Sequence, residues 1–173
     1  SAAGSFNEDI SAWDTSGVTR MDYMFYGALA FDQDIGGWAV DGVKDMDAMF
    51  KRALAFDQDL GAWDTSGVTT MRVMFHEATS FNQDISGWAV HSVTSMYTMF
   101  LGASAFNQDI GDWDTSGVKS MEAMFFYAMA FDQDLGDWAL DSLTTMSQMF
   151  EGASAFNQDL GWCLDESVDF DPH

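Results

Sequence analysis

The stretch FNQDISGWAVHSVTSMYTMFLGASAFNQDI, residues 81–110, returns to its own beginning. The letters FNQDI open it at Phe81 and recur 25 residues later at Phe106. The same period runs through the chain of 173 residues, with units that start at Phe6, Phe31, Phe56, Phe81, Phe106, Phe131 and Phe156. A fixed period is typical of repeat proteins, in which each unit covers the core of its neighbours. We therefore predict one repeat domain over residues 1–162, followed by a partial C-terminal cap or tail over residues 163–173.

Two local spacings alternate within each unit. Apolar residues recur at helical spacing in the second half of the unit, at Val18, Met21, Met24, Phe25 and Ala28. In the segment 6–10, alternate residues share a face, which is strand spacing. These spacings predict an α/β repeat solenoid, a right-handed coil with one short parallel strand and one short helix per 25-residue repeat and about seven coils.

Trp and Met recur at fixed positions, and we expect these residues in the core. Trp occurs once per unit, at Trp13, Trp38, Trp63, Trp88, Trp113 and Trp138. Met occurs twice, three residues apart, for example at Met71 and Met74. An exposed strip of Trp side chains that stack on carbohydrate is the alternative.

The charge balance restricts the partners. The chain holds 28 acidic and 6 basic residues, which gives a formal charge of −22. Nucleic acid and anionic membranes repel such a surface. No apolar run approaches the roughly 18 residues of a membrane-spanning helix, so we expect no membrane insertion. An unidentified protein or glycan is the expected partner.

One acidic column carries the only candidate metal site. An Asp ends the FNQD-like motif of every unit, and stacked units would place these carboxylates in a row. Two interpretations stay open: each carboxylate accepts backbone N–H groups, or Ca²⁺ lies between neighbouring coils. The proposed calcium ligands are Asp34, Asp59, Asp84, Asp109 and Asp134. No other cofactor is expected.

No catalytic arrangement is visible, and we predict that the protein is not an enzyme. His76, His91 and His173 share no repeat position. A regular repeat offers no asymmetric pocket for catalysis. Partner binding is instead expected at variable positions just before each second Met, namely Tyr23, Ala48, Val73, Thr98, Ala123 and Gln148. An incomplete Thr column, which includes Thr19, Thr69, Thr94 and Thr144, raises ice binding as a distant alternative.

The segment WDTSGVTTMRVMFHEATSFNQDISGW, residues 63–88, resembles the bacterial surface protein 26-residue repeat, also called the PARCEL repeat, which is similar to BspA-like leucine-rich repeats. The resemblance covers essentially the whole chain. This chain departs from the family in its strict period of 25 and in SGV where SNV is commoner. The resemblance implies a leucine-rich-repeat-like fold at the cell surface or in a secreted protein.

Together these features predict a non-catalytic extracellular module for adhesion, recognition or scaffolding within a larger surface protein. A calcium-binding acidic structural solenoid is the alternative, and an ice-binding or carbohydrate-binding surface is a more distant one. Uncapped end coils predict end-to-end self-association. Cys163 is expected either in a cap disulfide, which the resemblance implies, or as a small buried residue.

Overall fold

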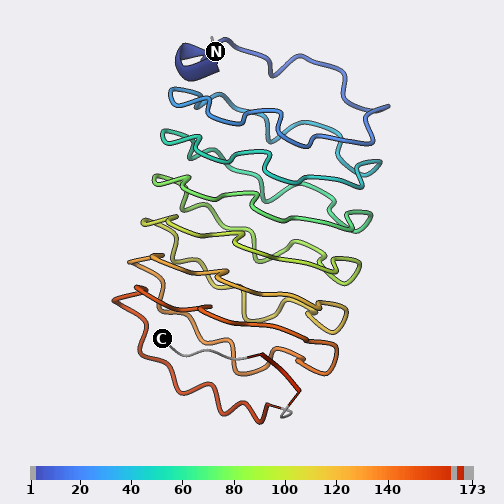
Figure 1. Ribbon diagram of the computed structural model, residues 1–173. Coiled ribbons are helices and arrows are strands. Elements are labelled where there is room, and N and C mark those ends of the chain that lie inside the picture. The colour runs from blue at the N-terminus through green and yellow to red at the C-terminus, as the bar shows by residue number, and fades with distance from the viewer. Residues whose placement is uncertain (1–2, 165–166, 170–173) are drawn as a thin grey trace.

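A computed structural model describes residues 3–164 and 167–169 of the chain. Each repeat forms one coil, and the coils lie one below another from the N-terminus to the C-terminus (Figure 1). Coil 1 begins at Phe6, coil 2 at Phe31, and so on to coil 7 at Phe156. Residues that lie 24–28 positions apart in the sequence are therefore hydrogen-bonded neighbours in space, as with Met96 and Ser120.

The prediction of one helix and one strand per repeat is wrong. Within the described residues, the helical content is one short 3₁₀ helix, η1 (Ala3–Ser5). The parallel pairing consists of isolated bridges: Arg20 with Asp45, Asp45 with Thr70, Ser95 with Ser120, Ser120 with Thr145, and Thr145 with Asp169. The part of the chain that the structure describes thus contains no α-helix and no sheet.

Consecutive turns replace the predicted helix. In coil 4, the N–H groups of Met99, Leu101 and Ala103 each bond to the carbonyl three residues back, at 3.0–3.3 Å. The N–H groups between them donate to the next coil, as from Phe100 to Met124 at 2.9 Å. Thr98 and Gly102 have φ of 48° and 67°, which no α-helix accommodates. A chain of four-residue turns also brings residues i and i+3 together, so the apolar spacing imitates a helix.

Side chains replace the expected strand ladder in the FNQD-like segments. Asn82 Oδ1 accepts the N–H of Asn107 in the next coil at 2.9 Å. The same oxygen accepts Gln108 Nε2 at 3.0 Å. In a β-ladder a backbone carbonyl would accept that N–H. The prediction of a strand here fails because an Asn or Asp oxygen takes the role of the carbonyl.

Aromatic columns form the core. Phe75 and Phe81 are fully buried and stack with ring centroids 4.0 Å apart. Each also stacks on the equivalent ring of the next coil, at 5.6 and 6.0 Å. The prediction of buried Trp and Met columns is confirmed from coil 2 to coil 6. Coil 1 differs, since Trp13 is 53% and Met24 is 40% exposed.

Thr98 is expected to be a site of local strain. It is 4% exposed, its φ is 48°, and its Oγ1 is buried without a hydrogen-bond partner. Coils 2 and 5 carry Ala48 and Ala123 at this position. Thr98→Ala should therefore raise the free energy of unfolding by about 0.5–1 kcal/mol, because it removes an unpaired hydroxyl and a β-branch from a left-handed position.

Urea denaturation measures this change, with Thr65→Ala as the matched control. Thr65 is also buried, but its Oγ1 donates to the Ala89 carbonyl at 3.0 Å. Its replacement should destabilise by about 1 kcal/mol. Loss of stability in both variants would contradict the assignment of strain to Thr98.

Candidate recognition surface

The Asp column caps its own turns. All the proposed calcium ligands are exposed, and each Oδ1 accepts the N–H two residues ahead at 2.8–3.0 Å. Asp84, for example, bonds the N–H of Ser86 at 2.9 Å. The structure brings Asp59 and Asp84 to one shallow hollow, together with small residues of the same turns. The described residues contain no group of three or more His, Cys, Asp or Glu side chains suited to a metal ion.

Serine hydrogen bonds lower the pKa of several of these caps. The Ser11 hydroxyl, and then the Ser11 N–H, lower the pKa of Asp9 below its ordinary value of 3.8. Ser16 does the same for Asp14 in the turn that follows. A carboxylate with a lowered pKa stabilises the fold above its ordinary pKa and loses that contribution as the pH falls through the folded value. These turns therefore stay capped at neutral pH.

Calcium is expected to change the melting temperature little. A strong site saturated about 100-fold over its Kd would contribute about 2.7 kcal/mol and raise Tm by roughly 5–10 °C. Because the Asp oxygens already bond backbone N–H groups, we expect a shift below about 2 °C between EDTA and millimolar CaCl₂. NaCl of equal ionic strength controls for screening of the −22 charge. A calcium-specific rise that disappears in Asp84→Asn would contradict this expectation.

The predicted partner-binding positions do not form one surface. All six have positive φ, but their side chains differ in accessibility. Tyr23 and Gln148 are exposed and Val73 is half-buried. Ala48, Thr98 and Ala123 are buried in the core, at 2%, 4% and 6% exposure. Because all six positions share one backbone conformation, the difference follows side-chain size: the short side chains of Ala48, Thr98 and Ala123 are covered, whereas the long ones of Tyr23 and Gln148 reach solvent.

Positions that both vary between units and are accessible to solvent lie a few residues later, along an edge that we call the variable edge. It comprises the positions two, three and five residues after each second Met. The first is occupied by Tyr26, Lys51, His76, Leu101, Phe126 and Glu151. The second is occupied by Gly27, Arg52, Glu77, Gly102, Tyr127 and Gly152, and the third by Leu29, Leu54, Thr79, Ser104, Met129 and Ser154.

The two halves of each coil differ in charge. The segments that contain the variable edge are 19–29, 44–54, 69–79, 94–104, 119–129 and 144–154. They hold all six basic residues, all four Tyr and six of the 28 acidic residues. Their formal charge is zero, so the whole net charge of −22 lies elsewhere. This segregation is visible in the sequence and is the signal that could have located the variable edge.

Ion pairs cross between coils in these segments. Arg20 contacts Asp22 at 2.9 Å and Asp45 of coil 2 at 3.4 Å. The hydrogen bond with Asp22 raises the pKa of Arg20 and lowers that of Asp22. Arg52 pairs with Glu77 of coil 3 at 3.2 Å.

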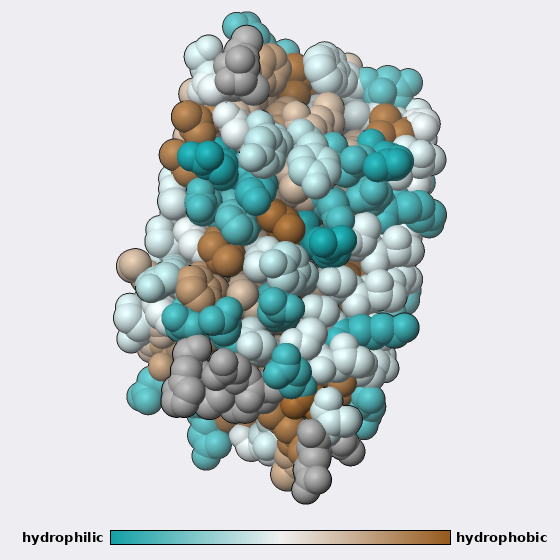
Figure 2. Space-filling view, viewed as in Figure 1, coloured by the Kyte–Doolittle hydropathy of each residue, from teal (hydrophilic) through white to brown (hydrophobic). Residues whose placement is uncertain are grey.

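His76 lies beside this pair, and its Nε2 is 3.7 Å from Glu77. Burial, followed by the charge of Lys51, lowers the pKa of His76, so this histidine is neutral at pH 7. On the face shown in Figure 2, hydrophobic residues are scattered among hydrophilic ones and form no continuous band.

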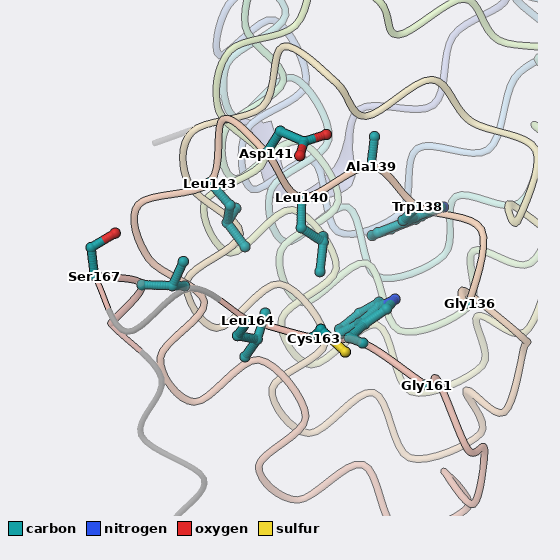
Figure 3. A pocket seen from close by; sticks show the side chains of 12 residues that line it. Gly136, Trp138, Ala139, Leu140, Asp141, Leu143, Gly161, Cys163, Leu164 and Ser167 are labelled. Atoms are coloured by element: carbon teal, nitrogen blue, oxygen red, sulfur yellow. The ribbon is translucent and has the colours of Figure 1, made fainter.

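A pocket of about 490 Å³ lies at the C-terminal end of the stack. Leu140, Leu143 and Leu164 point into the same space (Figure 3).

The last repeat is shortened by one residue before its Trp. Cys163 occupies the Trp position, and the Nε1 of Trp162 still donates to the Leu135 carbonyl at 3.1 Å. Cys163 is exposed and free, so the expected buried thiol is not found. The predicted cap, residues 163–173, lies partly outside the described residues. His173 lies wholly outside them.

The comparisons with known proteins match the chain to a protein family. The family described as "Mycoplasma protein of unknown function, DUF285" matches residues 1–67 and again residues 56–163. No curated protein and no solved structure matches the chain. In the described part of the chain, no helix has the length and apolar character to span a bilayer.

Proposed function

We propose that this chain, which belongs to the Mycoplasma family of unknown function DUF285, is a non-catalytic recognition module that binds its partner along the variable edge. One observation carries the proposal. Core positions repeat almost unchanged from coil to coil, whereas the variable edge changes between aromatic, basic, acidic and small residues. Repeat proteins bind through side chains that vary on a constant frame.

Strained backbone supports the same surface. The middle position of the variable edge has positive φ in each of coils 1 to 6, with glycine in coils 1, 4 and 6. Arg52, Glu77 and Tyr127 have φ of 60°, 56° and 53° at this position. Non-glycine residues there cost roughly 1 kcal/mol each relative to glycine. Such residues gather at functional sites when their side chains are needed.

The experiment replaces these three residues with the glycine that other coils carry. Random displayed peptides and an arrayed set of glycans are screened for ligands of the wild-type protein. We expect the selected ligands to lose at least tenfold in affinity for the triple variant Arg52→Gly, Glu77→Gly, Tyr127→Gly, because interface energy concentrates in a few side chains. Asp59→Asn and Asp84→Asn together form the control on the opposite half of the coil. Ligands that depend on the Asp pair and not on the edge would overturn the proposal.

A location at the cell surface and a relationship to the PARCEL and BspA-like repeats are also part of the proposal. The resemblance to the PARCEL and BspA-like repeats supports a role in adhesion or scaffolding at the cell surface. The test is the sequence that flanks this chain in its parent protein. A signal peptide and an anchor favour the surface role, whereas a fused catalytic domain reduces the module to a targeting arm.

End-to-end association remains a prediction of its own. The exposed Trp13 and Met24 of coil 1 give it an apolar surface. Added salt should promote association, because it screens the repulsion between molecules of charge −22.

A further inference from the structure

Two large hydrophobic side chains are exposed in the middle of the stack. Exposed large hydrophobics in the described residues are Trp13, Tyr23, Met24, Tyr26, Leu29, Tyr127 and Met129. The first five lie in coil 1, which has a described coil on one side only. Tyr127 and Met129 lie in coil 5, between coils 4 and 6, and are still 48% and 52% exposed. Their exposure is therefore not an effect of the end of the stack.

The Tyr127 ring is held in place by its neighbours. A Cβ atom at Gly152 of coil 6 would lie 2.3 Å from the ring, so the ring occupies the space that this glycine leaves. Phe126 meets the ring edge-on, with centroids 4.6 Å apart. The Tyr127 N–H donates to the Glu151 carbonyl at 2.8 Å. An aromatic side chain fixed in this way loses little conformational entropy when a partner binds, which is typical of interface hot spots.

One acidic residue precedes this pair in the same segment, and another lies in the next coil. Glu151 lies in the adjoining coil, and Gln148 donates to its carboxylate at 3.1 Å. Glu122 precedes the pair in coil 5, and Lys119 is the one basic residue between 106 and 155. The segments of the variable edge carry a formal charge of zero, but the chain as a whole carries −22, which attracts cationic partners at long range and repels a second copy.

We propose that Phe126, Tyr127 and Met129, which we call the Tyr127 patch, bind a cationic peptide segment that carries an apolar or aromatic anchor side chain. The anchor packs on the Tyr127 ring and the Met129 side chain, and the flanking Lys or Arg residues face Glu122 and Glu151. This inference rests on the proposed function, because it names the partner of one part of the variable edge.

The probe is the peptide Lys-Lys-Leu-Phe-Lys-Lys, titrated into protein labelled with ¹³C at the methionine methyl groups. Met129 reports on the patch, and Met24, which is 40% exposed in coil 1, is an internal control in the same spectrum. We expect the Met129 resonance to shift and Met24 to stay in place. Lys-Lys-Ala-Ala-Lys-Lys should bind at least tenfold more weakly, and Glu-Glu-Leu-Phe-Glu-Glu should not bind.

The variants use residues that the repeat already accepts. Tyr127→Gly copies Gly27, Gly102 and Gly152, and Met129→Ser copies Ser104 and Ser154, so both should fold. Unchanged resonances of the buried methionines verify this. Each variant should weaken binding of the Leu-Phe peptide at least tenfold. The control Trp13→Phe, at an exposed ring of coil 1 that lies outside the variable edge, should leave it unchanged.

Four outcomes would overturn the inference. If Lys-Lys-Ala-Ala-Lys-Lys binds as tightly as Lys-Lys-Leu-Phe-Lys-Lys, charge attraction alone accounts for the binding and no apolar site is needed. Unchanged affinity in Tyr127→Gly and Met129→Ser places the site elsewhere. A Met129 shift on concentrating the protein alone identifies a second copy as the occupant. If the glycine-substituted edge variant loses its screened ligands while the Tyr127 patch binds no peptide, the proposed function stands and this inference fails.

Discussion

Phe75→Ala is expected to lower the free energy of unfolding by about 3–5 kcal/mol, a large share of the stability of a domain of this size. Phe75 is fully buried and stacks on Phe81 at 4.0 Å, on Phe50 at 5.4 Å and on Phe100 at 5.6 Å. Its removal leaves a cavity that adjoins three coils. The columns cannot collapse into this cavity, because each ring also supports the ring of the next coil.

Urea denaturation followed by circular dichroism measures this loss. Phe75→Leu keeps most of the volume and should cost about 1–2 kcal/mol. Phe126→Ala, a half-buried ring on the variable edge, is the control and should cost about 1 kcal/mol or less. Equal effects of Phe75→Ala and Phe126→Ala would contradict a core organised around the stacked columns. A repeat stack can unfold in steps, so transitions from two probes should be compared.

Trp113→Phe is expected to cost about 2–3 kcal/mol even though an aromatic ring is retained. Trp113 is 3% exposed, and its Nε1 donates to the Ile85 carbonyl of coil 4 at 3.2 Å. Phenylalanine cannot donate, so that buried carbonyl loses its partner. The smaller ring also leaves part of the indole volume empty.

The same change in coil 1 provides a matched control. Trp13 is 53% exposed, and Trp13→Phe should change the stability by less than about 0.5 kcal/mol. Both variants are compared by urea denaturation under the same conditions. If Trp113→Phe is as mild as Trp13→Phe, the indole hydrogen bonds do not contribute to the cohesion between coils.

The glycines of the variable edge connect stability with recognition. Gly152 has φ of 72°, and the Tyr127 ring covers it. Gly102 lies against Glu77 in the same way, with the Cγ of Glu77 3.4 Å from the position of a Cβ. Glu77 and Tyr127 are thus each followed by glycine in the next coil, whereas Arg52 is followed by Glu77, with which it forms an ion pair. The pairing lets single large side chains lie along the edge while the coil spacing stays constant.

The sequence by itself determined which residues form the core. The 25-residue period and its Phe, Trp and Met columns identify the residues that the structure buries from coil 2 to coil 6. This inference needs only the tendency of apolar side chains to leave water. The hydrogen bonds of the Asp column could also be predicted from the sequence, because their donor is the backbone N–H only two residues ahead. Asp84 and Ser86 make that bond.

Only the tertiary structure decided the backbone conformation between these columns. A spacing of three residues fits a helix and a chain of turns equally well. The choice between helix and turns depends on which carbonyl accepts each N–H. In coil 4 the Phe100 N–H donates to the Met124 carbonyl, 24 residues away. Thr98 lies in the same run of turns, has positive φ and is 4% exposed, so its side chain is not accessible to a partner. Local propensity cannot contain this information, because the competing acceptor belongs to the next coil.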